Sequence, residues 1–521
     1  MSGDQTEPKP DRLLHFERRM SEAEALMWNI EKDPWLNPSG ATVTILDRPI
    51  DVPMFRRRIA AAVADIPRLR QHVVPGIGRV APPSWATDTE LDLEFHVRHI
   101  SLPAPGTRRQ LYDLVTRFYE DPFDRTRPLW QFVVIDGLEG GRSALFMKLH
   151  HTISDGNGLV RISESYMERR REAPAPPDID LAQILADAVA AEHAEQAAAG
   201  EGSGSDPAGF LNSAASSVNH LVRRQFGVAR RMAGGALRLS TNPVGAKEAG
   251  EDAVATLRSL YGQLVGSGGE VAGGSPLWKH RSRRRHLESL RLPLPDVKRA
   301  GIALGGSVND VFVTGAVMGA LRYHDERGVD VDALNISFVV STKTDDSSGT
   351  NSFTPSRVQI PGAAMTAQER FDAVRALMEA GKSEVRGSGA LSGIAGVANL
   401  LPTSVVTRFA RGQAAKMDFA TSNLRAAPFT MYISGAEILE SATMGPVAGT
   451  AFNLTALSYN GWLDLGLFID PVAVDDPAAL RYAMVAAYDD LLRAGGVGIA
   501  VKAKPKASPQ PSPKSVSRSQ G

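Results

Sequence analysis

Residues 145–162 read LFMKLHHTISDGNGLVRI, an apolar run that stops at two adjacent histidines, His150 and His151. The run has the length and composition of a buried strand, whereas Leu159 and Ile162 keep helical spacing after the glycines. Neighbouring side chains of a strand point to opposite faces, so the two histidines share a direction only if the strand has ended. The segment therefore predicts a strand, a tight turn and a helix, with one histidine facing a cavity and the other anchoring the turn.

Three interpretations of the histidine pair follow from spacing alone. In the first, both are satisfied core side chains at a strand end, and Asp155 caps the next helix. In the second, His151 and Asp155 are two ligands of a metal site. Such a site needs another histidine ligand, and none of the nine other histidines (eleven less these two) stands in a pattern that matches one. In the third, a neutral imidazole is a general base that takes a proton from an attacking hydroxyl. Gly156 and Gly158 permit a tight backbone beside Asp155.

Composition excludes several other classes of protein. The chain of 521 residues carries 58 Lys plus Arg and 58 Asp plus Glu, a balance that argues against a dedicated nucleic-acid-binding protein. It has no cysteine, which excludes a thiol nucleophile, disulfides and cysteine-ligated metal. Residues 1–20 lack the apolar core of a secretory signal, and no run reaches the roughly 18 apolar residues of a spanning helix. We therefore expect a cytoplasmic protein with at most peripheral membrane contact.

Length and local composition divide the chain into two α/β regions, because 521 residues exceed one ordinary core. Between them lies a stretch rich in alanine, glycine and proline that is typical of a connector. The expected parts are a flexible N-terminus over 1–19, a first domain over 20–172, a helical connector over 173–275, a second domain over 276–497 and a disordered basic tail over 498–521.

Local patterns predict several elements of the first domain. Ser21 and Glu24 form a capping-box pattern, which predicts that a helix begins there. Gly140 and Gly141 predict a hairpin turn between two strands. Alternation of apolar residues and helical spacing predict further elements, namely strands over 41–46 and 91–100 and a helix over 108–120.

The motif HHTISDG matches the HHxxxDG pattern of the CoA-dependent acyltransferases. Its surroundings resemble the bacterial wax ester synthase/diacylglycerol acyltransferase family. FDRTRPLWQFVVIDGLEGGRSALFMKLHHTISDG resembles that family's R-P-L-W segment, hairpin and catalytic motif in their usual order. Four later segments resemble its Asn-Asp helix, its Gly/Asn-rich loop with the next strand, its Ser-Asn turn and its closing strands. They are GGSVNDVFVTGAVMGALRYH, GTNSFTPSRVQIP, TSNLRAAP and LSYNGWLDLGLFIDP. The resemblance covers about residues 20–495.

The resemblance implies an α/β fold of two chloramphenicol-acetyltransferase-like domains, with mixed sheets flanked by helices and an active-site channel between them. It implies that His151 is the general base, which deprotonates an alcohol so that the oxygen attacks an acyl-CoA thioester. The acceptor would be diacylglycerol, a long-chain alcohol or both, and the products would be triacylglycerol or wax ester plus CoA. Acyl-CoA is a substrate in this scheme, and neither a cofactor nor a metal is expected.

The same resemblance assigns roles to the neighbours of His151. His150, Asp155 and Gly156 would fix the loop and orient the catalytic ring. In the superfamily this aspartate pairs with an arginine, and the sequence does not choose among three candidates. They are Arg125, Arg127 and Arg161.

Further site residues are expected in the second half of the chain. Asn309 and Asp310 follow GGSV, where they either cap a helix or help to shape the channel. Asn351 and a turn at Ser422 and Asn423 are polar breaks among apolar strands. They either cap turns or donate hydrogen bonds to the thioester oxygen and the CoA arm.

Two positions depart from the family pattern. The family's first helix usually has an aspartate two residues before its first aromatic residue, where SEAEALMW has Glu24 and no matching aspartate. The Ser-Asn turn continues as LRAAP, where many relatives have Val-Pro-Gly-Pro. Both departures bear on acceptor preference or activity, and neither involves His151.

Lipid acceptors are insoluble, so the resemblance implies work at the inner face of the plasma membrane or on lipid droplets. The tail carries basic residues that either bind an anionic surface, at roughly 1 kcal/mol each, or only improve solubility. They are Lys502, Lys504, Lys506, Lys514 and Arg518. Two other functions stay open: the same chemistry with another donor or acceptor, and a non-catalytic lipid-binding or lipid-droplet protein. A binding protein needs no base, so the intact motif argues against the last. The oligomeric state also stays open.

Overall fold

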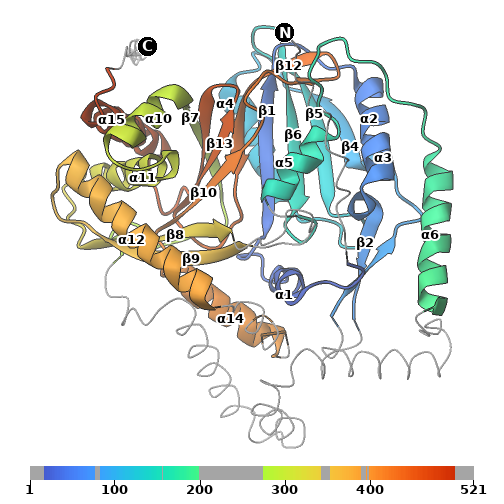
Figure 1. Cartoon of the computed structure of the whole chain (residues 1–521), viewed down its shortest axis with the longest axis horizontal. Helices are drawn as coiled ribbons and strands as arrows, with labels where there is room; N and C mark the ends of the chain where they lie inside the picture. Colours follow the sequence, from blue (N-terminus) through green and yellow to red (C-terminus); the bar gives the residue numbers. More distant parts are fainter. Residues whose placement is uncertain are drawn as a thin grey trace, which may run out of the picture.

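Two six-stranded sheets form the centres of two α/β halves that lie side by side (Figure 1). The computed structural model describes residues 17–76, 82–154, 156–198, 274–341, 353–388, 395, 398–399 and 401–498. Four expectations fall outside these ranges: the flexible N-terminus over most of its length, most of the connector, the basic tail and the loop that holds Asn351.

The first sheet has the strand order β11-β12-β1-β6-β5-β4, and it is mixed because β4 and β5 run parallel while the other pairs are antiparallel. Its strands are β1 (Ser39–Leu46), β4 (Val97–Ser101), β5 (Trp130–Leu138), β6 (Arg142–His150), β11 (Tyr432–Ile433) and β12 (Ala436–Met444). The surrounding elements are α1 (Glu22–Ile30), α2 (Val52–Asp65), η1 (Pro67–Arg70), β2 (Gln71–Val74), β3 (Ser84–Thr87), α3 (Leu93–His96), α4 (Arg108–Glu120), α5 (Gly156–Glu164) and α6 (Leu181–Ala198).

Local chemistry explains where several of these elements begin and end. The expected capping box starts α1, because Ser21 Oγ accepts from the Glu24 amide at 3.3 Å and Glu24 Oε2 accepts from the Ser21 amide at 2.8 Å. The expected hairpin joins β5 to β6, and Gly140 and Gly141 take the positive φ angles, 78° and 70°, that its turn requires. The expected helix over 108–120 is α4.

The expected strand over 91–100 is wrong in its first half. Leu93–His96 is a short helix, α3, and only Val97–Ser101 forms a strand. The Asp92 carboxylate accepts a hydrogen bond from the Glu94 amide at 2.8 Å, which starts a helical turn inside the alternating pattern.

The second sheet has the order β7-β14-β13-β10-β8-β9, and it is mixed because β10 runs parallel to both β13 and β8. Its strands are β7 (His286–Pro293), β8 (Ala333–Ser341), β9 (Phe353–Pro361), β10 (Phe419–Arg425), β13 (Phe452–Tyr459) and β14 (Trp462–Ile469). Its helices are α10 (Leu294–Ala303), α11 (Val308–Asp325), α12 (Ala367–Ser388), α14 (Thr403–Ala414) and α15 (Pro477–Ala494).

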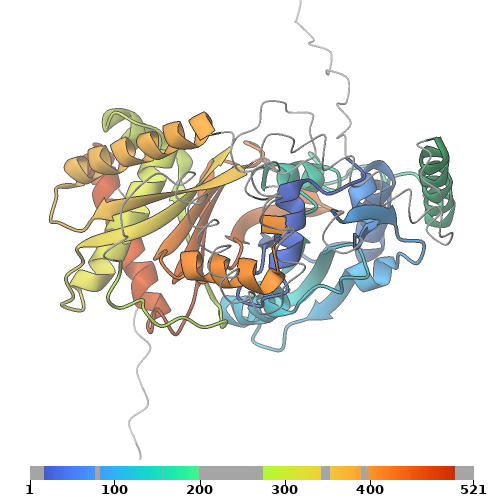
Figure 2. The same ribbon diagram turned by 90° about the horizontal axis from the view of Figure 1, so that it is seen from below.

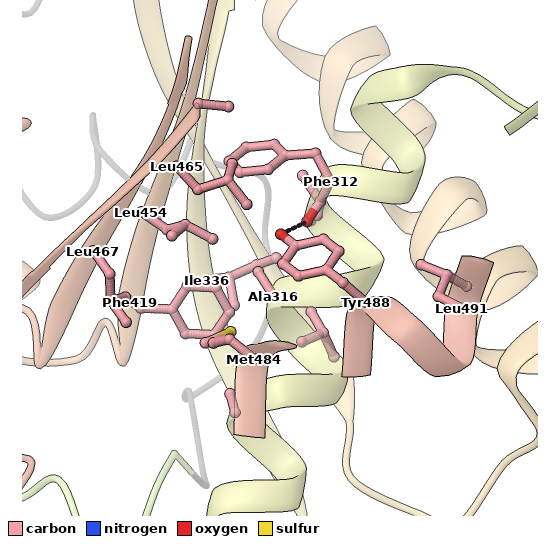
Figure 3. Packing of buried hydrophobic residues seen from close by; sticks show 14 of the residues in the cluster. Phe312, Ala316, Ile336, Phe419, Leu454, Leu465, Leu467, Met484, Tyr488 and Leu491 are labelled. Carbon is pink, nitrogen blue, oxygen red and sulfur yellow. Dashed lines mark hydrogen bonds between the residues drawn. The ribbon is translucent and has the colours of Figure 1, made fainter. Parts of the chain in front are cut away.

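Helices α11 and α15 bury the outer face of the second sheet (Figures 1 and 3). Phe312 and Ala316 of α11 meet Met484 and Tyr488 of α15 and the apolar side chains of β13 and β14 (Figure 3). The Tyr488 hydroxyl donates to the Phe312 carbonyl at 2.7 Å, so the buried phenol is satisfied within the core. This core fixes α11, whose first turn reaches the space between the two halves.

Strand β12 belongs to the second half of the chain but pairs with a strand of the first sheet. The expected second domain, which begins at residue 276, did not include such a pairing. β12 pairs antiparallel with β1, with Thr42 opposite Thr443 and Thr44 opposite Ser441. Its backbone also packs on β14, because Gly466 has no side chain there. A Cβ at Gly466 would lie 2.0 Å from the Thr443 carbonyl oxygen.

Of the connector, the structure describes its first part, including α6 at the outer edge of the first half (Figure 2). Glu192 fastens this helix by accepting from the Thr87 hydroxyl at 2.7 Å. Within the described ranges no single helix is long and apolar enough to cross a bilayer. The pair α10 and α11 meets the length and composition criteria only together, with a bend of 92° between them.

The contact at Gly466 makes a prediction about stability. Gly466→Ala places a methyl group against the β12 backbone, and we expect the free energy of unfolding to fall by about 1–3 kcal/mol. Urea denaturation measures this change. Gly412→Ala is the matched control, because nothing lies within 4 Å of a Cβ at this helical position. It should leave stability unchanged or raise it by up to about 1 kcal/mol. Equal stability of the Gly466 variant and the wild type would contradict direct packing of β12 on β14.

Candidate functional site

His151 is the first residue after β6, and it lines a cavity between the two halves. Its backbone N–H donates to the Pro38 carbonyl at 3.1 Å, and its Nδ1 lies 3.4 Å from the Ser154 carbonyl oxygen. In the tautomer with hydrogen on Nδ1, the ring donates to that carbonyl and Nε2 carries the lone pair that a general base needs. Gly40 of β1 faces the Nε2 side of the ring, since a Cβ at Gly40 would lie 3.7 Å from Nε2.

His150 is fully buried and does not line the cavity. Its Nδ1 accepts from the Thr152 amide at 3.1 Å and lies 2.7 Å from the Thr152 hydroxyl. Its Nε2 makes a long polar contact of 3.4 Å with Oε2 of Glu31. The two adjacent rings therefore have different surroundings, one in the cavity and one in the packed turn.

Glu31, the C-cap residue of α1, is a site residue that the sequence reasoning missed. Arg125 donates to its Oε2 at 2.9 Å and to the Trp28 carbonyl at 2.9 Å. Burial by itself would raise the pKa of this carboxyl, but His150, Arg125 and Lys148 outweigh burial and hold the pKa below its usual value. A carboxylate at a helix C-terminus opposes the helix dipole, and this was the available signal that Glu31 has compensating partners.

The arginine that pairs with Asp155 is not identified, because Asp155 lies outside the described residues. Of the three candidates, Arg125 pairs with Glu31, and Arg127 Nε lies 3.5 Å from Asp124 Oδ2. Gly156 is the first residue of α5. Among the residues that the structure describes, no group of three or more His, Asp or Glu side chains is placed to hold a metal ion.

The expected cap at Asn309 and Asp310 is displaced by two residues. Ser307 is the N-cap of α11, and its hydroxyl accepts from the Asp310 amide. Asp310 Oδ2 accepts in return from the Ser307 amide at 2.8 Å, which completes a capping box. Ser307 takes this position because Asp310, three residues later, completes the box, whereas Asn309 is followed at that spacing by Phe312. The Asp310 carboxylate is engaged in this capping box, whereas Asn309 lines the cavity.

The expected turn at Ser422 and Asn423 is wrong, because both residues lie within β10. They pair with Thr455 and Ala456 of β13, and backbone pairing on this strand outweighs the turn preference of the polar residues. Both still line the cavity. Asn423 Nδ2 donates to Asn309 Oδ1 at 3.2 Å, so this amide pair joins β10 to the first turn of α11.

The cavity has a volume of about 690 Å³ and takes its walls from both sheets. Apolar side chains of α1, α5, α11 and β6 form much of the lining. Examples are Met27, Ile30, Leu145, Met147, Leu159 and Phe312. The arrangement brings one imidazole to an apolar space that both halves enclose. Such a site can hold long acyl chains beside a base.

Glu31 gives a prediction about stability and its pH dependence. At neutral pH, Glu31→Gln should lower the free energy of unfolding by about 2 kcal/mol, because the buried contacts lose their negative charge. The folded-state pKa is depressed, so this contribution exists above the unfolded pKa and disappears as pH falls through the folded pKa. Urea unfolding between pH 7 and pH 3 should show the gap between wild type and variant closing.

Glu326 offers the matched control, because it is also a helix C-cap residue and is exposed. Glu326→Gln should change stability by less than about 0.5 kcal/mol at every pH. A gap for the Glu31 variant that stays constant with pH would show that its carboxylate charge does not stabilise the fold.

Comparisons with known proteins agree with this arrangement. Residues 20–312 match the model of the wax ester synthase/diacylglycerol acyltransferase catalytic domain, and residues 350–492 match that of the WS/DGAT C-terminal domain. A protein of Mycobacterium tuberculosis H37Rv named "Putative diacyglycerol O-acyltransferase" is 27% identical over 501 residues, which cover 95% of each chain. Another from the same strain, named "Probable diacyglycerol O-acyltransferase Tgs4", is 26% identical over 81% of this chain and 85% of its own.

Solved structures resemble the fold as a whole. The wax ester synthase/diacylglycerol acyltransferase from Marinobacter aquaeolei VT8 superposes with a TM-score of 0.57 and 17% identity, covering 92% of this chain and all of its own. The first condensation domain of the calcium-dependent antibiotic synthetase gives 0.53 and 15%, covering 92% and 96%. The expected fold, two mixed-sheet halves with a channel between them, is confirmed. The chain belongs to the wax ester synthase/diacylglycerol acyltransferase family.

Proposed function

We propose that this chain transfers a long-chain acyl group from acyl-CoA to diacylglycerol, to a long-chain alcohol or to both, with His151 as the general base. The observation that carries the proposal is the position of the His151 ring on the apolar cavity between the two halves. Family membership and the names of the relatives support acyl transfer to such acceptors.

The proposed reaction needs one proton carrier and two bound substrates. Nε2 of His151 takes the proton of the acceptor hydroxyl while the oxygen attacks the thioester carbonyl carbon. The tetrahedral intermediate then collapses, the C–S bond breaks, and the imidazolium returns its proton to the departing thiolate. An ester and free CoA result. Every proton is accounted for without a covalent acyl-enzyme, which suits a chain that has no cysteine.

Oriented donors would stabilise the negative oxygen of that intermediate. The amide of Asn423, held by Asn309, and the Ser422 hydroxyl lie in the cavity lining and have the required chemistry. Asp310 is engaged in the cap of α11 and contributes by holding the helix that presents Asn309. No cofactor takes part, and acyl-CoA enters as a substrate.

The proposed acceptors are insoluble in water, so the enzyme would take them from a membrane or a lipid droplet. A peripheral association is therefore part of the proposal. Vesicle co-sedimentation of the full chain and of a chain that ends at residue 500 would test whether the basic tail contributes.

The first activity prediction concerns the base. With palmitoyl-CoA and either diolein or hexadecanol, the wild type should release CoA and form the matching ester, identified by mass spectrometry. His151→Ala should lower ester formation about 10²–10⁴-fold, the range expected for loss of a general base. His280→Ala is the matched control, because this histidine is exposed and does not line the cavity. Full activity of the His151 variant would disprove the assigned base, and CoA release without ester would indicate a thioesterase.

The second activity prediction concerns the space in front of the base. A Cβ at Gly40 would lie 3.5 Å from Cε1 of His151, an ordinary contact, so Gly40→Ala should retain most of the activity. The longer branches of valine would occupy the position of the acceptor hydroxyl. We expect Gly40→Val to lower kcat/KM about 100-fold with either acceptor. Wild-type kcat/KM in this variant would show that the acceptor approaches the ring from another side.

A further inference from the structure

Four hydroxyl side chains form a polar band across the wall of the cavity, next to the proposed base. Thr42 and Thr44 of β1 lie opposite Thr443 and Ser441 of β12, and all four line the cavity. Thr44, Thr443 and Ser441 are only 6%, 7% and 9% exposed. We call these four residues the hydroxyl belt. Hydroxyl groups in a largely apolar wall are costly unless they are hydrogen-bonded, so their position calls for an explanation.

The belt holds hydrogen-bond donors beyond those that its own pairing uses. The Thr42 hydroxyl donates to that of Thr443 over 3.4 Å, and the hydroxyls of Thr44 and Ser441 lie 3.1 Å apart. Each hydroxyl has one hydrogen to donate, and a pair uses one of its two hydrogens internally. Each pair therefore keeps one O–H for another acceptor, and the belt as a whole can donate two hydrogen bonds to a ligand.

The order of residues along β1 places the belt one step beyond the base. Gly40 faces His151, and Thr42 and Thr44 follow on the same face of the strand. At the usual strand rise, they stand roughly 7 Å and 13 Å further along the wall. The following pair, Ile45 and Glu440, is succeeded after a shift in register by Leu46 and Ile438, and Ile438 lines the cavity with Met431. Along β1, the wall therefore presents first the base, then the two hydroxyl pairs and then apolar side chains.

We propose that the hydroxyl belt binds the two ester carbonyls of a diacylglycerol and makes this chain select diacylglycerol over a long-chain alcohol. The inference rests on the proposed function, because it concerns the acceptor of that reaction. In a 1,2-diacylglycerol the carbon with the free hydroxyl is followed by two carbons that each carry an ester group, and each ester leads to an acyl chain. The two free O–H donors match the two carbonyl oxygens, and the apolar residues match the chains.

Other occupants fit this wall less well. A long-chain alcohol presents only methylene groups beyond its hydroxyl, so it would leave the two free O–H groups of the belt without acceptors. The acyl chain of acyl-CoA would do the same. The pantetheine arm of CoA has acceptors for the belt. It leads, however, to the charged nucleotide, whereas the wall leads from the belt to Ile438 and Met431. A site that hydrogen-bonds one substrate rejects an analogue that lacks the partner group.

Paired substitutions test the belt without leaving one hydroxyl unpaired. The two double variants are Thr42→Val with Thr443→Val, and Thr44→Val with Ser441→Ala. Valine keeps the shape of threonine and suits a strand, so both variants should fold. The control is Thr314→Val, which removes a buried hydroxyl that has no partner in the described structure and does not line the cavity.

The main measurement is the ratio of kcat/KM for diolein to kcat/KM for hexadecanol, with palmitoyl-CoA as donor. We expect the wild type to favour diolein and each double variant to lower the ratio about tenfold, while Thr314→Val keeps the wild-type ratio. An unchanged ratio in both double variants would overturn the proposal. A raised KM for palmitoyl-CoA with an unchanged acceptor ratio would also overturn it, because the belt would then bind the donor.

A binding measurement separates this proposal from the proposed function. Equilibrium dialysis with 1,2-dioctanoylglycerol and with 1-decanol needs no turnover. Each double variant should bind the diacylglycerol about tenfold more weakly than the wild type, whereas its dissociation constant for the alcohol should change little. Equal binding of dioctanoylglycerol by wild type and variants would overturn the belt even if ester is formed. Absence of ester with both acceptors would overturn the proposed function, while the dialysis result would still decide the belt.

Discussion

The pairing of β12 with β1 is the constraint on which the rest of the molecule depends. β12 reaches the first sheet from the second half of the chain, and it rests on β14 where Gly466 leaves room for its backbone. Two polar contacts hold the crossing: the Ser441 amide donates to Asp464 at 3.0 Å, and Arg291 donates to the Leu439 carbonyl at 2.7 Å. The cavity exists because this strand fixes the distance between the two sheets.

Two carboxyl groups near the cavity walls, Asp464 and Glu31, have pKa values shifted in opposite directions. Burial raises the pKa of the Asp464 carboxyl to about 6, although Arg291 and the Ser441 amide both act to lower it. The carboxylate is thus held under β12 at a cost in desolvation. On the other side of the site, Glu31 has a depressed pKa, because its cationic neighbours outweigh burial. One such carboxylate therefore stands at the end of α1 and the other under β12, two elements that line the cavity.

Local features were predictable from the sequence because their causes are local. The capping box at Ser21, the hairpin at Gly140 and α4 each depend on residues within a few positions of one another. The shifted cap at Ser307 was also local, because Ser307 and Asp310 have the spacing of a capping box. The strand conformation of Ser422 was not predictable in this way, because it depends on pairing with Thr455 of β13.

The site itself could be predicted only in part. The histidine motif identified one residue of the cavity, and its family resemblance supplied the role still to be tested. Glu31 could not be placed beside His150 from the sequence, because the contact joins elements more than a hundred residues apart. The alternation in β1 implied that Thr42 and Thr44 share a face. Their partnership with Ser441 and Thr443 required the register of a strand about 400 residues away.

The crossing of β12 also has a consequence for how the protein is made. β1 ends at Leu46 and its partner strand ends at Met444, so the ribosome adds about 400 residues between the two. At roughly 5–20 residues per second, this interval lasts about 20–80 s. During that time the nascent first sheet presents the bare edge of β1, which is the kind of edge that recruits foreign strands. The yield of folded protein should therefore depend on translation speed and on chaperone occupancy over this interval.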